Sequence, residues 1–157
     1  MILDSQCQFS ASQALTATAL STNVINLSVD RNIGVGTPMA VMFNVSVAAD
    51  QTTGDEDYMF DIETASDAGI TTARKLLGRR IFESGTPTAP AEDADLLVAG
   101  FTFAIPIPPG GLAESEQYLG VRYTLAGTTP TITVSAFLVP LSTVEKSNVY
   151  ADGISIT

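Results

Sequence analysis

The chain has 157 residues, of which 45% are apolar and 15% are charged, so it is long enough to form one domain around a sizeable core. Its 17 acidic and 7 basic residues give a net charge of −10, which repels nucleic-acid phosphate and argues against direct binding of DNA or RNA. With no histidine and a single cysteine, Cys7, the sequence lacks the commonest general base and metal ligand. We therefore expect no catalytic residue, no metal and no cofactor, and we do not expect an enzyme.

The start of the chain, MILDSQCQFSASQ, has no basic residue before Asp4 and no apolar run of seven or more. A secretory signal is therefore not expected. The apolar stretches elsewhere are too short to cross a bilayer, which predicts no membrane partner. We expect synthesis in the cytoplasm.

Alternating apolar and polar residues predict β-strands along most of the chain. A hairpin is expected around GTTP at 127–130, and residues 57–64 are expected to have one solvated face. Residues 73–84 fit both a helix and a strand, and the strand is favoured because every clear neighbour is one. The other strands are expected at 13–20, 23–29, 38–50, 96–107, 117–127 and 131–141, with a terminal strand around Ile154 and Ile156 as an option.

Seven to nine strands without a convincing helix indicate an all-β fold, either an antiparallel β-sandwich or a jelly roll. Two such sheets bury their inner faces against each other, and the alternation along each strand supplies those faces. We expect residues 1–157 to form a single domain with N- and C-terminal arms.

The strand at 96–107 runs into a proline-rich end, FAIPIPP, in which Pro106 and Pro108 lack backbone donors. Both missing donors fall on the same flank of the strand, so this flank cannot be paired in full. The segment either closes a sheet edge against strand addition or lays Ile105 and Ile107 on another subunit.

Charged residues cluster in two places. Seven acids between Asp50 and Asp67 have the density of a Ca²⁺ site, but their spacing does not match the helix-loop-helix pattern, and solvated charge accounts for them equally well. Arg74, Lys75, Arg79 and Arg80 form a local basic patch. This patch meets either an acidic partner or the acidic strand of the same molecule.

Several stretches, taken together and in order, carry a family resemblance. They are MILDSQCQFSASQALTATALSTNVINL, GTPMAVMFNVSVAAD with TTGDEDYMFDIETA, FAIPIPPG, YLGVRYTLAGTTPTITVSAFLV and YADGISI. This combination resembles the small capsid cement, or head decoration, proteins of tailed bacteriophages, of the kind found in short-tailed Bordetella phages.

The resemblance implies a jelly-roll protein of the virion that binds the outer surface of an icosahedral head and clamps neighbouring major capsid subunits. Its partners would be the major capsid protein and other copies of itself in a homo-oligomer. The alternative is a jelly-roll carbohydrate-binding module that uses Tyr58, Tyr118, Tyr123 and Tyr150. The residues expected to contact the capsid or another subunit are Ile2, Leu3, Phe9, Arg79, Arg80, Ile105, Ile107, Ile154 and Ile156, with packing of the termini on the chain's own sheet as the alternative.

Overall fold

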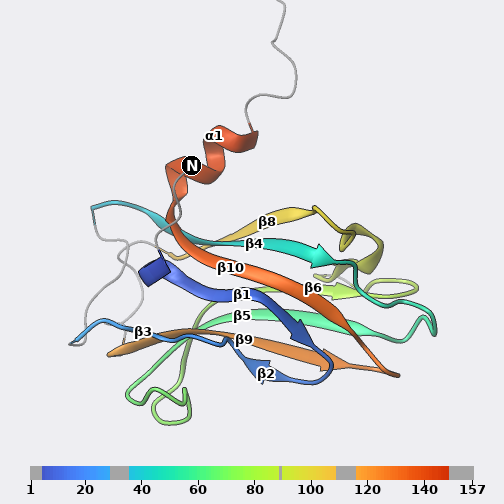
Figure 1. The fold of residues 1–157 in the computed structure, drawn as a ribbon, viewed down its shortest axis with the longest axis horizontal. Coiled ribbons are helices and arrows are strands. Elements are labelled where there is room, and N and C mark those ends of the chain that lie inside the picture. Colours follow the sequence, from blue (N-terminus) through green and yellow to red (C-terminus); the bar gives the residue numbers. More distant parts are fainter. Residues whose placement is uncertain (1–4, 29–35, 89, 109–115, 149–157) are drawn as a thin grey trace, which may run out of the picture.

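The computed structural model describes residues 5–28, 36–88, 90–108 and 116–148 (Figure 1). Short 3-10 helices span Ser5–Cys7 and Ala94–Leu96, and the one α-helix of the described chain, α1, spans Leu141–Asn148. The strands are β1 (Gln8–Leu15), β2 (Ala19–Leu20), β3 (Ile25–Asn26), β4 (Met39–Val47), β5 (Asp57–Ala65), β6 (Lys75–Glu83), β7 (Glu92–Asp93), β8 (Thr102–Pro106), β9 (Tyr118–Ala126) and β10 (Ile132–Pro140).

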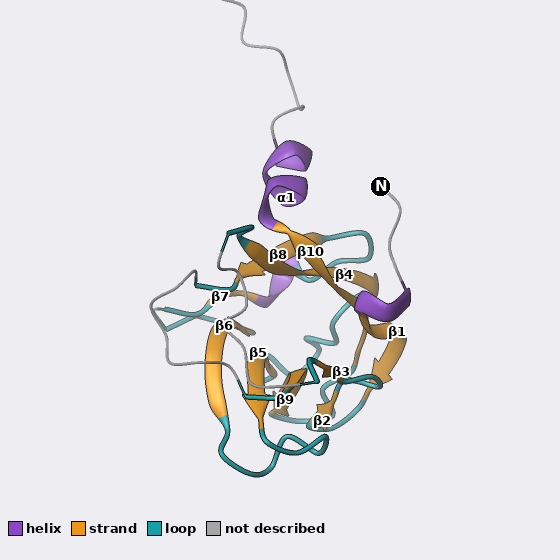
Figure 2. Cartoon of the chain, turned by 90° about the vertical axis from the view of Figure 1, so that its left-hand side faces the viewer, coloured by secondary structure: helices purple, strands orange, loops and turns teal. Residues whose placement is uncertain are grey.

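The strands form two sheets that face each other across the core (Figure 2). Sheet A has the order β1-β10-β4-β8, and sheet B has the order β2-β9-β5-β6-β7, with β3 also paired to β9. Among the described strands, β7 alone pairs in parallel, and its partner is β6 at Phe82 and Glu83. The expected all-β sandwich is confirmed.

The pairing is nested in a way that identifies the sandwich as a jelly roll. β5 pairs with β6, β4 with β8, β2 and β3 with β9, and β1 with β10, as in one long hairpin. Additional pairing of β10 with β4 and of β9 with β5 rolls this hairpin into two sheets. This is the double-sheet arrangement of eight-stranded jelly rolls, with β2 and β3 sharing one strand position.

Aromatic rings from both sheets fill the middle of the core. The ring of Phe43 in sheet A stacks on that of Phe103 with centroids 4.9 Å apart, and it meets the edge of Phe60 in sheet B at 5.4 Å. Phe60 also makes edge contacts with Phe82 and Tyr123. These contacts join the two sheets through one continuous apolar cluster.

The sandwich is nearly closed where β6 of sheet B approaches β8 of sheet A. A Cβ atom at Gly78 would lie 2.6 Å from the Cγ2 atom of Ile105 and 3.4 Å from the carbonyl oxygen of Pro106. Glycine is therefore required here for the two strands to come together. The expectation that residues 73–84 form a strand is confirmed by β6.

Several expected elements differ from those observed. The strand expected at 13–20 is two strands, because residues 16–18 form the corner at which the chain passes from sheet A to sheet B. The hairpin expected at 127–130 is wrong, since β9 and β10 lie in different sheets. The strand expected to 141 ends at Pro140, where the alternation stops and α1 begins. The optional strand around Ile154 and Ile156 lies outside the described residues.

Candidate functional site

The prolines of the FAIPIPP segment lie along an edge of sheet A. The backbone N–H of Ile107 donates to the carbonyl of Met39 in β4 at 2.9 Å. Because donors alternate along a strand, the nitrogens of Pro106 and Pro108 face the outer edge of β8, which has no neighbouring strand in the described chain. The edge-closing interpretation of this segment therefore fits.

The side chains of Ile105 and Ile107 point the other way, into the core, where they are 4% and 2% exposed. They are not available to contact another subunit, so this expectation was wrong. The positions of the prolines show which edge of the strand is open. They do not show which of its two faces is buried. That depends on sheet B, which covers this face of β8.

Residues 20–23 cover the opposite edge of sheet A, at β1. The Asn23 N–H donates to the carbonyl of Phe9 at 2.8 Å, and the side-chain amide of Gln13 donates to the carbonyl of Leu20 at 3.0 Å. The Asn23 bond occupies a backbone acceptor of β1, and the Gln13 bond holds the covering segment along the edge where another strand would add. Both edges of sheet A are thus obstructed.

The expected contact residues near the N-terminus are placed only in part. Phe9 is fully buried in the core cluster, because β1 pairs with β10 and turns this ring toward sheet B. The expectation that Phe9 contacts a partner was therefore wrong, and packing on the chain's own sheet is observed instead. Ile2, Leu3, Ile154 and Ile156 lie outside the described residues.

The outer face of sheet B carries a network of buried carboxylates and arginines, where a solvated face was expected. Asp61 accepts two hydrogen bonds from Arg79, at 2.7 and 2.8 Å. Glu63 accepts one from Arg74 at 2.6 Å and one from Arg122 at 2.8 Å. Asp61 and Glu63 are each 2% exposed, so that expectation was wrong. Arg79 on β6 and Arg122 on β9 are cross-strand neighbours of Asp61, and Arg74 lies just before β6.

A loop at residues 66–73 completes the cover over this network. Ile70 is fully buried with a left-handed φ of +50°, and it packs over Gly120, where a Cβ atom would lie 3.1 Å from its Cγ1. Arg122 donates to the carbonyl of Ile70 at 2.9 Å. Asp67 holds the loop through the N–H groups of Thr71 and Thr72, and these bonds, chiefly the one from Thr72, lower its pKa to about 2.

The basic patch is engaged within the molecule. Arg79 binds Asp61, and Arg80 makes two hydrogen bonds to Glu92, at 2.6 and 2.7 Å, which lower the pKa of Glu92. The guanidinium of Arg80 also lies 5.0 Å from the centroid of the Phe103 ring. Of the two interpretations of the patch, pairing with acids of the same molecule is the one observed. Arg79 and Arg80 do not offer an unpaired charge to a partner.

The acids at 50–57 build turns. Glu56 is fully buried, and its carboxylate accepts hydrogen bonds from the N–H groups of Thr53, Gly54 and Asp55. It also accepts one from the Thr53 hydroxyl, and this bond is the largest cause of the lowered pKa of Glu56. Asp55 accepts from Thr128 across the sandwich end. Within the described ranges, no three acidic or cysteine side chains gather closely enough to hold a metal ion.

Among the tyrosines proposed for sugar binding, the three that the structure describes do not form a platform. Tyr58 and Tyr123 are fully buried. The hydroxyl of Tyr58 donates to the carbonyl of Asp50, and that of Tyr123 is 2.7 Å from the Ser10 hydroxyl. Burial raises the pKa of Tyr58 to about 12. Tyr118 is half-buried and Tyr150 lies outside the described residues. The three described rings named for the carbohydrate-binding alternative are therefore not exposed together on one surface.

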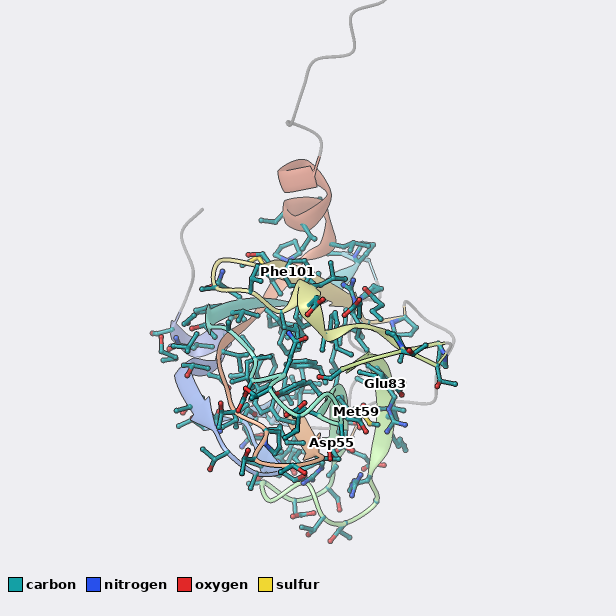
Figure 3. All side chains as sticks on the ribbon, turned by 90° about the vertical axis from the view of Figure 1, so that its right-hand side faces the viewer. Asp55, Met59, Glu83 and Phe101 are labelled. Atoms are coloured by element: carbon teal, nitrogen blue, oxygen red, sulfur yellow. The ribbon has the colours of Figure 1, made fainter. Side chains whose placement is uncertain are left out.

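The end of the sandwich seen in Figure 3 combines acidic and apolar side chains. We call it the acidic end and define it as residues 47–57, 83–88, 90–98 and 126–131, which contain no lysine or arginine. Burial, and the nearby charges of Glu83 and Asp55, raise the pKa of Asp57 there. Its acidic residues are Asp50, Asp55, Glu56, Asp57, Glu83, Glu92, Asp93 and Asp95.

Exposed apolar side chains also concentrate at the acidic end. Val47, Leu96 and Val98 are 59%, 43% and 54% exposed, and among the described residues Leu76, on β6, is the fourth large apolar side chain of this kind. Nothing in the sequence analysis singled out this set. The lack of basic residues from 83 to 98 was visible in the sequence, but Val47 and Val98 were placed within the strands expected at 38–50 and 96–107.

Comparison with known proteins identifies the family. The described part of the chain contains no helix long and apolar enough to span a bilayer. No curated protein matches the sequence. The sequence model of the family Bbp16, which takes its name from a Bordetella phage protein, matches residues 9–138. Since this match runs from β1 to β10 and includes both sheets, the chain belongs to the Bbp16 family.

Proposed function

We propose that the protein is a capsid cement protein that binds the outer surface of an icosahedral phage head and clamps neighbouring major capsid subunits. The observation that carries this proposal is the Bbp16 family match across the whole jelly roll. The protein acts by binding and not by catalysis. It works as a homo-oligomer, and in the virion it lies on the side of the shell away from the packaged DNA.

Two features of the molecule support this role. The obstructed edges of sheet A prevent copies from adding to one another as further strands, so contacts with neighbours go through side-chain surfaces. The net charge of −10 is unfavourable next to packaged DNA and is tolerated on the outside of the head.

The proposed mechanism is stabilisation by mass action. A protein that binds only the assembled lattice stabilises it by about 2.7 kcal/mol when its free concentration is about a hundredfold above its dissociation constant. An oligomer that touches several capsid subunits gains further through effective concentration.

The test is co-sedimentation of the purified protein with expanded heads that lack it, followed by heating of the decorated and undecorated heads. We expect saturable binding and a higher temperature of head disruption for the decorated heads. A glycan array probed in parallel tests the carbohydrate-binding alternative. Protein that stays in the supernatant at all concentrations would overturn the proposal.

A further inference from the structure

We infer that the acidic end is the surface through which the protein docks on its partner, and that the partner presents an apolar patch bordered by lysine or arginine. This inference rests on the proposed function and identifies the partner surface as part of the outer face of the major capsid protein. It starts from the apolar side chains Val47, Leu96 and Val98, which we call the apolar tip.

The apolar tip is formed by two segments that lie side by side. The Ala49 N–H donates to the carbonyl of Leu97 at 3.0 Å, and the Gly100 N–H donates to that of Val45 at 2.8 Å. These two bonds bracket Val47 on one segment and Val98 on the other. The exposed valines therefore lie on neighbouring stretches of backbone, and exposed apolar side chains concentrated in this way mark an interaction surface.

The tip is held firmly by the body of the protein. Leu97, between two exposed tip residues, is fully buried in the core, and so is Ala94. Gln51 donates to the carbonyl of Ala94 at 2.7 Å, and Asp93 caps the 3-10 helix by accepting from the Asp95 N–H. A surface that is already ordered loses little conformational entropy when a partner binds.

The surrounding charge selects the partner. Of the acids at this end, Glu92 is paired with Arg80, and the others make no ion pair with a described basic residue. A partner with lysine or arginine around an apolar centre gains attraction at long range, which speeds association. A second copy that docked through the same end would bring acid against acid, which disfavours self-association there.

The experiment measures binding to expanded heads by co-sedimentation for the wild type and for two pairs of variants. Val47→Ser/Val98→Ser removes two of the three apolar side chains of the tip. Leu76→Ser is the matched control because Leu76 is 46% exposed near the start of β6, at the far end of this strand from Glu83. Asp93→Asn/Asp95→Asn removes two charges and retains the cap, because asparagine also caps helices. Glu116→Gln, beyond the acidic end, is its control. Thermal unfolding verifies that each variant is folded.

We expect Val47→Ser/Val98→Ser to raise the dissociation constant at least about tenfold, as for truncation of central interface residues, and Leu76→Ser to leave it within about twofold. Asp93→Asn/Asp95→Asn should weaken the dependence of binding on salt between about 50 mM and about 300 mM, where screening changes most.

The remaining outcomes distinguish a wrong docking surface from a wrong function. If the wild type binds heads and folded Val47→Ser/Val98→Ser binds equally well, the docking surface is wrong and the proposed function stands. If the tip variant loses self-association and keeps head binding, the occupant is a second copy and the inference is overturned. If the wild type does not bind heads, both the proposed function and the inference fail.

Discussion

Glu63 is a buried acid whose charge is compensated by two arginines. Its carboxylate is 3% exposed and lies between Arg74, which is 48% exposed, and Arg122, which is 20% exposed. Burying a carboxylate in this way is costly unless cations and hydrogen bonds compensate it. Here each arginine binds one of the two carboxylate oxygens of Glu63. The acid is therefore part of the structure of sheet B and not a free surface charge.

We expect Glu63→Gln to destabilise the protein by about 3 kcal/mol, because breaking a buried ion pair leaves its partners uncompensated. The free energy of unfolding in urea measures this cost. Glu116→Gln is the matched control. It removes a partner of Lys75. The side chains of Lys75 and Glu116 are 39% and 16% exposed, so this pair is more open to solvent than Glu63, and its loss should cost less, about 1 kcal/mol. Equal costs for the two variants would contradict this account of the network.

The role of the acids at 50–67 could be predicted only in part from the sequence. Their density was evident, and pairing between the acidic and basic strands was one of two expected arrangements. The burial of Glu63 was not predictable, because Arg122 lies 59 positions away in the chain and the covering loop depends on the unusual backbone conformation of Ile70. Local patterns do not reveal such distant neighbours.

Among the elements, strands within one sheet were predicted better than the places where the chain changes sheet. β4, β5 and β9 are long, and each was predicted as a strand close to its observed bounds, although β5 is buried on both faces instead of one. At 127–130 the turn residues indicated that the chain reverses, but a reversal does not decide whether the flanking strands bond to each other. Gly127, whose Cβ atom would lie 2.2 Å from the Asp55 carbonyl oxygen, packs there against the backbone just before β5.

The edge strand β8 gives a prediction about association. Pro106→Val/Pro108→Val restores two backbone donors on its open flank and leaves the core face unchanged. We expect the variant to self-associate with rising concentration, because an unprotected edge can pair with another chain. Size-exclusion chromatography with light scattering measures the change in mass. Pro87→Val, in the loop before β7, is the control. A variant with the wild-type mass across the concentration range would show that the prolines do not protect this edge.

At the scale of the whole molecule, the nested pairing makes the two ends of the jelly roll depend on each other. β1 pairs with β10 from Gln8 opposite Phe137 to Leu15 opposite Ile132. It also supplies Phe9 and Leu15 to the core, where they are 0% and 3% exposed. The first strand is therefore needed to complete a sheet whose last strand is made more than a hundred residues later.

Deletion of residues 1–16 removes β1 and should prevent stable folding. Loss of two large core side chains costs on the order of 2–5 kcal/mol each, against a total stability of about 5–15 kcal/mol. Circular dichroism and limited proteolysis measure the outcome. Deletion of residues 1–4, which keeps every described element, is the control and should unfold cooperatively. A cooperative β-sheet melt for the longer deletion would contradict this dependence.

The pairing of the first and last strands also fixes where the chain enters and leaves the jelly roll. β1 begins and β10 finishes at the same end of the sandwich, opposite the end at which β4 finishes with Val47 (Figure 1). An enzyme, an epitope or a fluorescent label fused beyond either strand would start from the end where β1 begins. If the protein docks on phage heads through the acidic end, as proposed, heads coated with such fusions would display the fused protein on their outer surface.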